Sequence, residues 1–431
     1  MAALSVSTAF AQLVEVRRLQ SVLGSQAKEQ YALTLQAIDD FDGDDLPDLL
    51  VGIPKVHRVE LLSGKEYCEI VPFQSDLPDD LGWTLIPPVD VNGDGKPDFI
   101  FGIPANVPTG AEEDTRGAIA IYRSDVQADG VIRYNSQRIR SDVPGAFLGE
   151  SVVWLGGPKK IFVATSPSFT GGTAYLFSAL DGKRVGEVDF DFAFAHENDR
   201  KGYLAWGAPD IDHDGFRDFA IGAVGQDPTN NVDFESPGWI YLYSGKTARL
   251  LTVLQGSRPT SHLGMSFASV GDLNGDGWEE FAVGVPYQRC AGENRCGAVY
   301  ILDGHSLRPP TDKPRLITID EREPEVMFSA FGTNKNELLG FQVARFADVN
   351  GDGIPEILVA APGSGKFRGQ VQIRSGKDFT VLKIIDGDAD GEWFASRLES
   401  DPSLKRIFVG SPYFSSEGLP LRGRLDVYEV K

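Results

Sequence analysis

Five short acidic stretches recur along the chain, and their spacing constrains the fold more than any other feature. Each carries an acid or amide side chain at its first, third, fifth and ninth positions, and the stretches begin at Asp40, Asp90, Asp210, Asp272 and Asp348. Fourteen residues after each first Asp an apolar segment ends, at Pro54, Pro104, Val224, Pro286 and Pro362. This constant offset predicts a loop of fixed length that leads into a strand of fixed length, as in repeat proteins.

Each repeat reads as four short strands separated by turns. A Gly-led segment such as GWIYLY, from Gly238, follows the apolar segment, and a turn, often SGK, leads to a fourth strand. Residues 148–167 and 391–412 keep the strands but shorten or replace the acidic loop, which brings the number of repeats to seven. Seven such units predict an all-β protein, a seven-bladed β-propeller with four-stranded antiparallel blades.

The two ends of the chain complement each other. The last repeat ends at Lys431 after its third strand, and an apolar segment from Leu13 precedes the first repeat. We expect this N-terminal segment to supply the outer strand of the last blade, because closure removes an open sheet edge. The predicted propeller is a single domain that spans residues 12–431.

The formal charge of −21 argues against nucleic acid as a partner, because phosphates are bound by Lys and Arg. With 42% hydrophobic and 10% aromatic residues the chain can build a core, so its acidity does not indicate disorder. No apolar run reaches the roughly 18 residues of a membrane-spanning helix. We expect a monomer whose negative charge is offset by bound cations.

The N-terminus and the cysteines indicate an oxidising compartment. Residues 1–11 end in Ala9-Phe10-Ala11, the pattern that precedes a signal-peptide cleavage site; the alternative is a disordered tail. Cys290 and Cys296 flank one predicted loop, where we expect a disulfide, whereas Cys68 falls in a predicted strand and is expected to be a buried free thiol. These features predict a secreted, periplasmic or cell-surface protein.

The acidic loops predict metal sites, because Ca²⁺ takes about six to eight oxygen ligands. We expect side-chain ligands from positions 1, 3, 5 and 9, namely Asp40, Asp42, Asp44, Asp48; Asp90, Asn92, Asp94, Asp98; Asp210, Asp212, Asp214, Asp218; Asp272, Asn274, Asp276, Glu280; and Asp348, Asn350, Asp352, Glu356. Position 7 would add the main-chain carbonyls of Leu46, Lys96, Phe216, Trp278 and Ile354. Gly at position 6 permits a sharp turn in four loops, and Asp45 replaces it in the first. The prediction is about five Ca²⁺ ions with a structural role.

Three other interpretations of these loops are weaker. An EF-hand needs Glu at position 12 and flanking helices, but position 12 is apolar in all five loops. Asn-Gly and Asp-Gly make good hairpin turns, yet a turn does not need four oxygen ligands. Two carboxylates 4 Å apart repel by about 4 kcal/mol at an effective dielectric of 20, so a cation is expected between them. Mg²⁺ is the alternative ion, but it seldom takes all-protein cages.

The unit resembles the FG-GAP repeat of the integrin alpha-subunit N-terminal propeller. The resemblance rests on a Leu-Gly pair before the first strand, the D-x-[DN]-x-D-G-x-x-[DE] loop, and Gly-x-Pro after the second strand, as at Leu81-Gly82 and Leu263-Gly264. It implies Ca²⁺ on the lower face and protein partners on the opposite face. The chain resembles a free-standing secreted relative, such as a bacterial one, since it has five ion loops and no following leg domains.

Binding is favoured over catalysis. The five histidines are scattered over different repeats, His213 is expected to point outward, and no G-x-S-x-G or H-E-x-x-H motif occurs. Loops opposite the metals, at 105–116, 225–237, 287–296, 413–422 and 320–338, carry candidate partner-binding aromatics: Phe234, Tyr287, Phe367, Tyr413 and Phe414. We therefore predict an extracellular protein-interaction or adhesion module. The alternatives are aromatics that pack locally, and a hydrolase or carbohydrate-binding propeller with a site at the ring axis.

Overall fold

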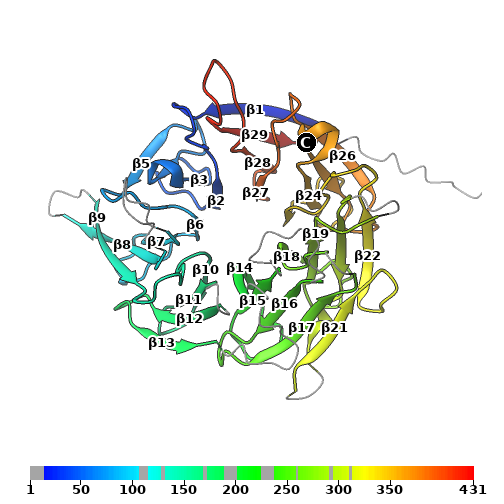
Figure 1. Cartoon of the computed structure of the whole chain (residues 1–431), viewed down its shortest axis with the longest axis horizontal. Coiled ribbons are helices and arrows are strands. Elements are labelled where there is room, and N and C mark those ends of the chain that lie inside the picture. The colour runs from blue at the N-terminus through cyan, green and yellow to red at the C-terminus, as the bar shows by residue number, and fades with distance from the viewer. Residues whose placement is uncertain are drawn as a thin grey trace, which may run out of the picture.

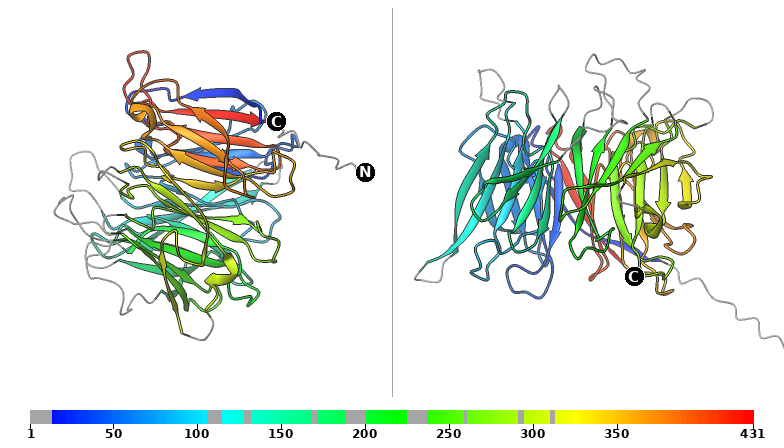
Figure 2. Two further views of the ribbon diagram at one scale, coloured as in Figure 1. Left: turned by 90° about the vertical axis from the view of Figure 1, so that its right-hand side faces the viewer. Right: turned by 90° about the horizontal axis from the view of Figure 1, so that it is seen from below.

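Seven β-sheets surround a central axis, which confirms the predicted seven-bladed β-propeller (Figure 1). The computed structural model describes residues 14–105, 115–127, 132–167, 172–188, 201–224, 237–258, 261–290, 295–309 and 313–431. Seen from the side, the strands of each blade run between the two faces of the ring (Figure 2). The predicted tail at residues 1–11 lies outside the described residues.

The blades follow one another along the chain, each with strands that pair in order from the axis outward. Blade 1 contains β2 (Thr34–Ile38), β3 (Asp48–Ile53), β4 (Arg58–Leu62) and β5 (Glu69–Gln74), with the 3-10 turn η1 (Pro54–Val56); blade 2 contains β6 (Thr84–Leu85), β7 (Phe99–Ile103), β8 (Ala118–Val126) and β9 (Ile132–Arg140); blade 3 contains β10 (Val152–Gly156), β11 (Ile161–Ser166), β12 (Thr173–Ser178) and β13 (Arg184–Glu187). Blade 4 contains β14 (Lys201–Ala208), β15 (Asp218–Ala223), β16 (Trp239–Tyr243) and β17 (Leu250–Gly256); blade 5 contains β18 (Ser266–Gly271), β19 (Glu280–Val285), β20 (Ala298–Leu302) and β22 (Val326–Phe331); blade 6 contains β23 (Val343–Arg345), β24 (Ile357–Ala361), β25 (Gln370–Arg374) and β26 (Val381–Asp386), with helix α2 (Ser364–Phe367); blade 7 contains β27 (Arg397–Asp401), β28 (Arg406–Ser411), β29 (Arg424–Val430) and β1 (Val16–Leu23).

The second strand of each blade forms the centre of the core. β3, β15 and β19 are buried at every residue, because blades pack against both faces of their sheet. This is why these strands read as continuous apolar runs and not as alternating ones. One core cluster joins Ile240 of blade 4 to Phe281 of blade 5, so the apolar residues hold neighbouring blades together.

Glycines of the repeat lie where neighbouring blades touch through their backbones. A Cβ on Gly222, in the second strand of blade 4, would lie 2.4 Å from the carbonyl oxygen of Gly264, which precedes the first strand of blade 5. Gly264 itself has a φ of +100°. Gly52 and Gly82 make the corresponding contact between blades 1 and 2. The recurring Leu-Gly and Gly-x-Pro signatures therefore record a close approach between blades.

The N-terminal strand closes the ring, as predicted. β1 pairs antiparallel with β29, from Val16 opposite Val430 to Leu23 opposite Arg424, and forms the outer strand of blade 7 (Figure 1). The Arg18 guanidinium makes two hydrogen bonds of 2.9 Å to Asp388 of blade 6. Both ends of the described chain are therefore held in one sheet.

The connection between the third and fourth strands of blade 5 corrects one expectation. The predicted loop insertion at 320–338 instead contains β22, the outer strand of blade 5, whose half-buried side chains obscured its strand pattern. The extra residues precede it: helix α1 (Gly304–Leu307) and β21 (Arg315–Ile319) leave blade 5, and β21 adds to blade 4 as a fifth strand parallel to β17. A parallel strand from a later repeat leaves no local signal in the sequence.

Two of the three cysteines form a disulfide and the third is free. Cys290 and Cys296 form a disulfide with Cα atoms 5.9 Å apart. Cys68 is free but exposed, not buried as predicted, because it lies in the turn before β5 and not within the strand. Among the helices formed by the described residues, none has the length and apolar composition to span a membrane.

Candidate functional site

All five acidic loops connect the first and second strands of a blade, so they lie on one face of the ring, here called the loop face. They belong to blades 1, 2, 4, 5 and 6. Blades 3 and 7 have short turns there, at residues 157–160 and 402–405, as the degenerate repeats predicted. Lys160, in the short turn of blade 3, donates its Nζ to the carbonyl oxygen of Asp90 in the loop of blade 2, at 2.9 Å.

The Asp at position 1 shapes each loop in the same way. In all five loops it accepts a hydrogen bond from the N–H of position 6, at 2.8–3.0 Å. Asp45 makes this bond in the first loop with a φ of +67°, so it adopts the left-handed conformation that glycine takes in the other four. The first loop therefore has the same frame as its counterparts.

The carboxylate at position 9 is fully buried in every loop, at Asp48, Asp98, Asp218, Glu280 and Glu356. Each accepts a hydrogen bond from the N–H of position 2, at 2.5–3.2 Å. Burial raises the pKa of Asp218, Glu280 and Glu356 to about 7, because desolvation disfavours the charged form. A cation that restores the charge balance would hold these carboxylates ionised.

A serine at the end of the third strand contacts the acidic loop of the same blade in blades 1, 2 and 4; it lies within β8 in blade 2 and directly after the strand in the other two. In blade 2, Ser124 donates its N–H to Asp98 at 2.7 Å and its hydroxyl to Asp94 at 2.9 Å. Ser63 and Ser244 occupy the same place in blades 1 and 4, and their hydroxyls donate to the position-5 Asp of those loops. A serine hydroxyl at this place therefore orients the position-5 carboxylate in these three loops, and the serine belongs to an SGK turn in blades 1 and 4.

Blade 5 has Asp303 at this place, a residue that the sequence analysis missed. Its carboxylate lies near those of Asp276 and Glu280, with one oxygen from each within 4.8 Å of the others. It also accepts a hydrogen bond from the N–H of His305 at the start of α1. The alignment of LDGH with the SGK turns is the sequence signal that would have placed it.

The geometry of these loops fits a hard divalent cation. Two further groups of three carboxylates have oxygens within 4.8 Å of one another: Asp40, Asp42 and Asp48, and Asp210, Asp212 and Asp218. Asp212 Oδ1 is buried and has no hydrogen-bond partner, so an oxygen in this loop lacks the partner that a cation would supply. Position 3 is an amide in three loops, at Asn92, Asn274 and Asn350. The position-7 residues donate their N–H to the position-5 acid in all five loops.

The loops of blades 4 and 5 also touch each other through aromatic side chains. His213, at position 4 of one loop, is exposed and stacks on Trp278, at position 7 of the next, with ring centroids 3.6 Å apart. The ring of His305 meets the other side of this tryptophan edge-on, at 5.5 Å. The position-7 side chain therefore contributes to packing between loops.

A cavity of about 790 Å³ lies at the ring axis and is lined by residues of all seven blades, from Tyr287 and Tyr413 toward the face opposite the loop face to Pro402 in the blade 7 turn of the loop face. Its aromatic lining includes Trp83, Trp206, Phe341, Trp393, Tyr287 and Tyr413. Its charged lining residues are Glu150, Arg345, Arg397 and Glu399, and burial raises the pKa of Glu399 to about 7. The axial cavity therefore combines flat apolar surfaces with ionisable groups.

The structure separates the predicted partner-binding aromatics into three sets. Tyr287 and Tyr413 line the axial cavity. Phe367 stacks on the cavity residue Trp393 with centroids 4.7 Å apart, and Tyr413 meets the same tryptophan edge-on. Phe414 instead covers the buried Arg424 guanidinium at 4.4 Å, which is local packing. Phe234 lies outside the described residues.

Trp83, Met265 and Phe341 were not predicted as cavity residues, although they share a position in the repeat. Each directly follows the Leu-Gly pair of its repeat, and Glu150 holds the same position in blade 3. All four line the axial cavity. The Trp83 indole donates to Glu150 at 3.2 Å across the boundary between blades 2 and 3.

A ring of seven blades with acidic hairpins on one face is similar to the FG-GAP propeller of integrin alpha subunits, and the comparisons with known proteins support an integrin-like FG-GAP propeller. A family model described as the FG-GAP repeat matches residues 264–302 and 343–373. Integrin alpha-8 of Gallus gallus is 32% identical over 164 residues, which cover 36% of this chain and 14% of that protein. Integrin alpha-PS2 of Drosophila melanogaster is 32% identical over 189 residues, or 42% of this chain and 12% of its own length.

A longer match comes from an enzyme. Phosphatidylinositol-glycan-specific phospholipase D of Bos taurus is 24% identical over 394 residues, which cover 83% of this chain and 38% of that protein. The chain therefore spans less than two thirds of the length of these relatives. Among solved structures, Sqt1 of Saccharomyces cerevisiae matches with a TM-score of 0.52 at 11% identity, over 91% of this chain and 83% of that one, which shows the fold alone.

Proposed function

We propose that this chain is a calcium-binding module for extracellular protein interaction or adhesion. Structural Ca²⁺ would occupy the five hairpins of the loop face, held by side chains at positions 1, 3, 5 and 9 and the carbonyl at position 7. Partners would bind on the opposite face, at the mouth of the axial cavity. The observation that carries the proposal is this division: buried acids converge on the loop face, and cavity aromatics such as Trp83, Tyr287 and Tyr413 come from the strand connections of the opposite face.

The metal part of the proposal is tested by elemental analysis and thermal melting. We expect about five Ca²⁺ per chain and a large fall in Tm when a chelator is added, because an ion that binds only the folded chain stabilises it by mass action. Asp48→Asn should remove one ion without removing the others. A chain without bound metal, whose Tm does not change with chelator, would refute this part.

The partner-binding part is tested with a pair of exposed surface variants. Tyr413, at the cavity mouth, has 41% of its surface exposed, and Val381, on the outer strand β26, has 43% exposed. We expect Tyr413→Ser to abolish capture of proteins from the native medium, and Val381→Ser to leave it unchanged. Equal capture by both variants would place the interaction elsewhere.

A second candidate function is carbohydrate binding or hydrolysis at the axis. Three tryptophans and two glutamates line one cavity, which suits stacking against sugar rings and hydrogen bonding to hydroxyls. Titration with a panel of oligosaccharides, and a hydrolase activity panel on the same preparation, distinguish this candidate. Binding that is lost in Trp393→Ala and retained in Val381→Ser would favour it.

A further inference from the structure

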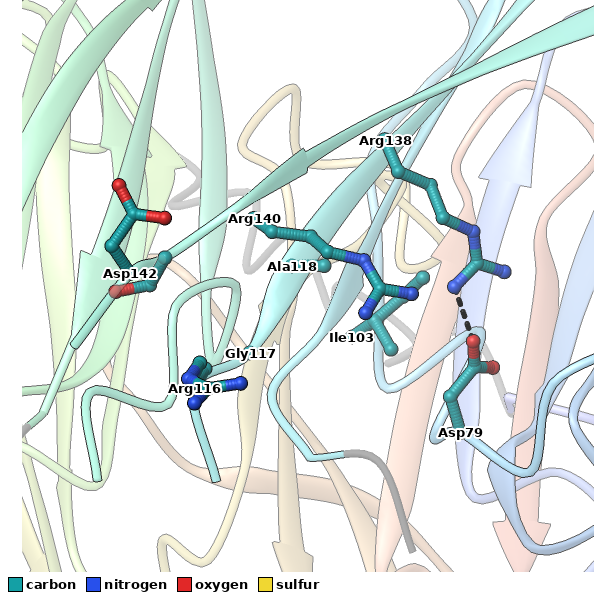
Figure 3. A pocket seen from close by; sticks show the side chains of 9 residues that line it. Asp79, Ile103, Arg116, Gly117, Ala118, Arg138, Arg140 and Asp142 are labelled. Atoms are coloured by element: carbon teal, nitrogen blue, oxygen red, sulfur yellow. Dashed lines mark hydrogen bonds and ion pairs between the residues drawn. The ribbon is translucent and has the colours of Figure 1, made fainter. Parts of the chain in front are cut away.

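Three arginines line a cavity of about 270 Å³ beside the outer strand of blade 2, and its lining shares no residue with the acidic loops or the axial cavity (Figure 3). Arg138 and Arg140 come from the end of β9, and Arg116 comes from the connection that precedes β8. Gly117 and Ala118 form part of its wall. We call this the arginine pocket.

Arg138 is held in place by its neighbours. Its guanidinium bonds to the carboxylate of Asp79, which is 1% exposed, and to the hydroxyl of Ser75 at 2.8 Å. Ser75 in turn donates to Asp79 at 3.0 Å. These contacts fix the orientation of Arg138 before any ligand arrives, so little side-chain entropy would be lost on binding.

Arg140 has no such contacts. It lies two residues after Arg138 on the same strand, so both side chains project from the same face of the sheet. Arg140 is exposed, and its side chain makes no hydrogen bond or ion pair within the described part of the chain. Figure 3 shows its guanidinium beside that of Arg138, while the carboxylate of Asp142 lies well away from both.

We propose that the arginine pocket binds a tetrahedral oxyanion, a sulfate or phosphate group, between Arg138 and Arg140. Guanidinium groups present paired N–H donors that match such oxygens. Three arginines and the two acids Asp79 and Asp142 line the pocket, in a chain whose net charge is −21. Long-range attraction of anions is therefore absent, and binding requires this local cluster.

The test is calorimetric titration of the full chain with sodium sulfate, in calcium-containing buffer at fixed ionic strength. We expect Arg140→Gln to weaken sulfate binding at least about tenfold, the effect of losing a charge-assisted hydrogen bond. Arg133→Gln is the matched control, because Arg133 is exposed on the same strand but does not line the pocket. Equal weakening by both variants, or the absence of binding to wild type, would overturn the proposal.

A crystal soaked in selenate gives a second, position-specific measurement. We expect an anomalous selenium peak between Arg138 and Arg140, and a peak elsewhere, or none, would overturn the assignment. Titration with methyl sulfate and methyl phosphate then distinguishes the two sources of the oxyanion, since tighter binding of one identifies the group that the pocket prefers.

Discussion

The imidazole of His213 lies flat against the indole of Trp278, with 3.6 Å between ring centroids and 2° between ring planes. The two residues belong to the acidic loops of neighbouring blades, so the stack joins two candidate metal sites. We expect Trp278→Ala to lower the free energy of unfolding by about 1 kcal/mol beyond the loss of buried area, and Trp278→Phe to retain most of the stability. Urea titration in calcium buffer measures both variants, and identical losses would show that stacking contributes nothing.

Because Gly264 lies in close contact with the neighbouring blade, we expect the addition of one methyl group there to lower the stability of the fold strongly. In Gly264→Ala the new Cβ would lie 2.5 Å from the carbonyl oxygen of Trp239, at a φ of +100°. We expect destabilisation of about 3 kcal/mol or more, from strain and overpacking together. Gly418→Ala is the control, because Gly418 also has positive φ, +76°, but no atom within 4 Å of its Cβ position, and should cost about 1 kcal/mol. Equal costs would contradict the close-approach explanation.

The buried carboxylate of Asp218 predicts opposite pH dependence with and without calcium. Its folded-state pKa, about 7, lies above its unfolded value of 3.8. In chelator, its contribution to stability is therefore present below pH 4 and lost as pH rises through 7. Calcium binds the ionised form, so its affinity should fall as pH drops below 7.

Asp218→Asn separates these effects. Without metal at pH 8 the variant should melt above the wild type, because a buried charge is gone; with calcium it should melt below the wild type, because a ligand is lost. Melting curves at pH 5 and pH 8, each with calcium or chelator, give the comparison. A variant that is less stable under all four conditions would argue that Asp218 has only a structural role.

Closure by β1 predicts that a short N-terminal truncation opens the ring. Removal of residues 1–23 would delete the strand that pairs with β29 and expose the edge of blade 7. We expect a lower Tm and concentration-dependent association, because an unpaired strand edge can pair with another chain. Removal of residues 1–13 is the control and should leave Tm unchanged. Size-exclusion chromatography and thermal melting measure both; similar behaviour of the two truncations would contradict the role of β1.

The spacing of residues along the sequence determined the hairpins, the strands and the number of blades. The constant distance from Asp210 to Val224, repeated in four other copies, specified a hairpin and the strand that follows it, and the count of copies gave seven blades. In every loop position 1 accepts a hydrogen bond from the N–H of position 6 and position 9 accepts one from the N–H of position 2, because these contacts form within a few residues of chain. Short-range patterns of this kind can be read from sequence.

Only the tertiary structure determined which side chains of different blades lie in contact. Trp83, Tyr287 and Trp393 come from different blades and share one axial cavity, and β21 adds to a sheet that the preceding repeat had already formed. Asp79, in the connection between blades 1 and 2, also meets Arg138 of β9, which lies 59 residues further along the chain. Such contacts depend on how the blades pack around the axis, and repeat spacing does not encode which side chains of separate blades come together.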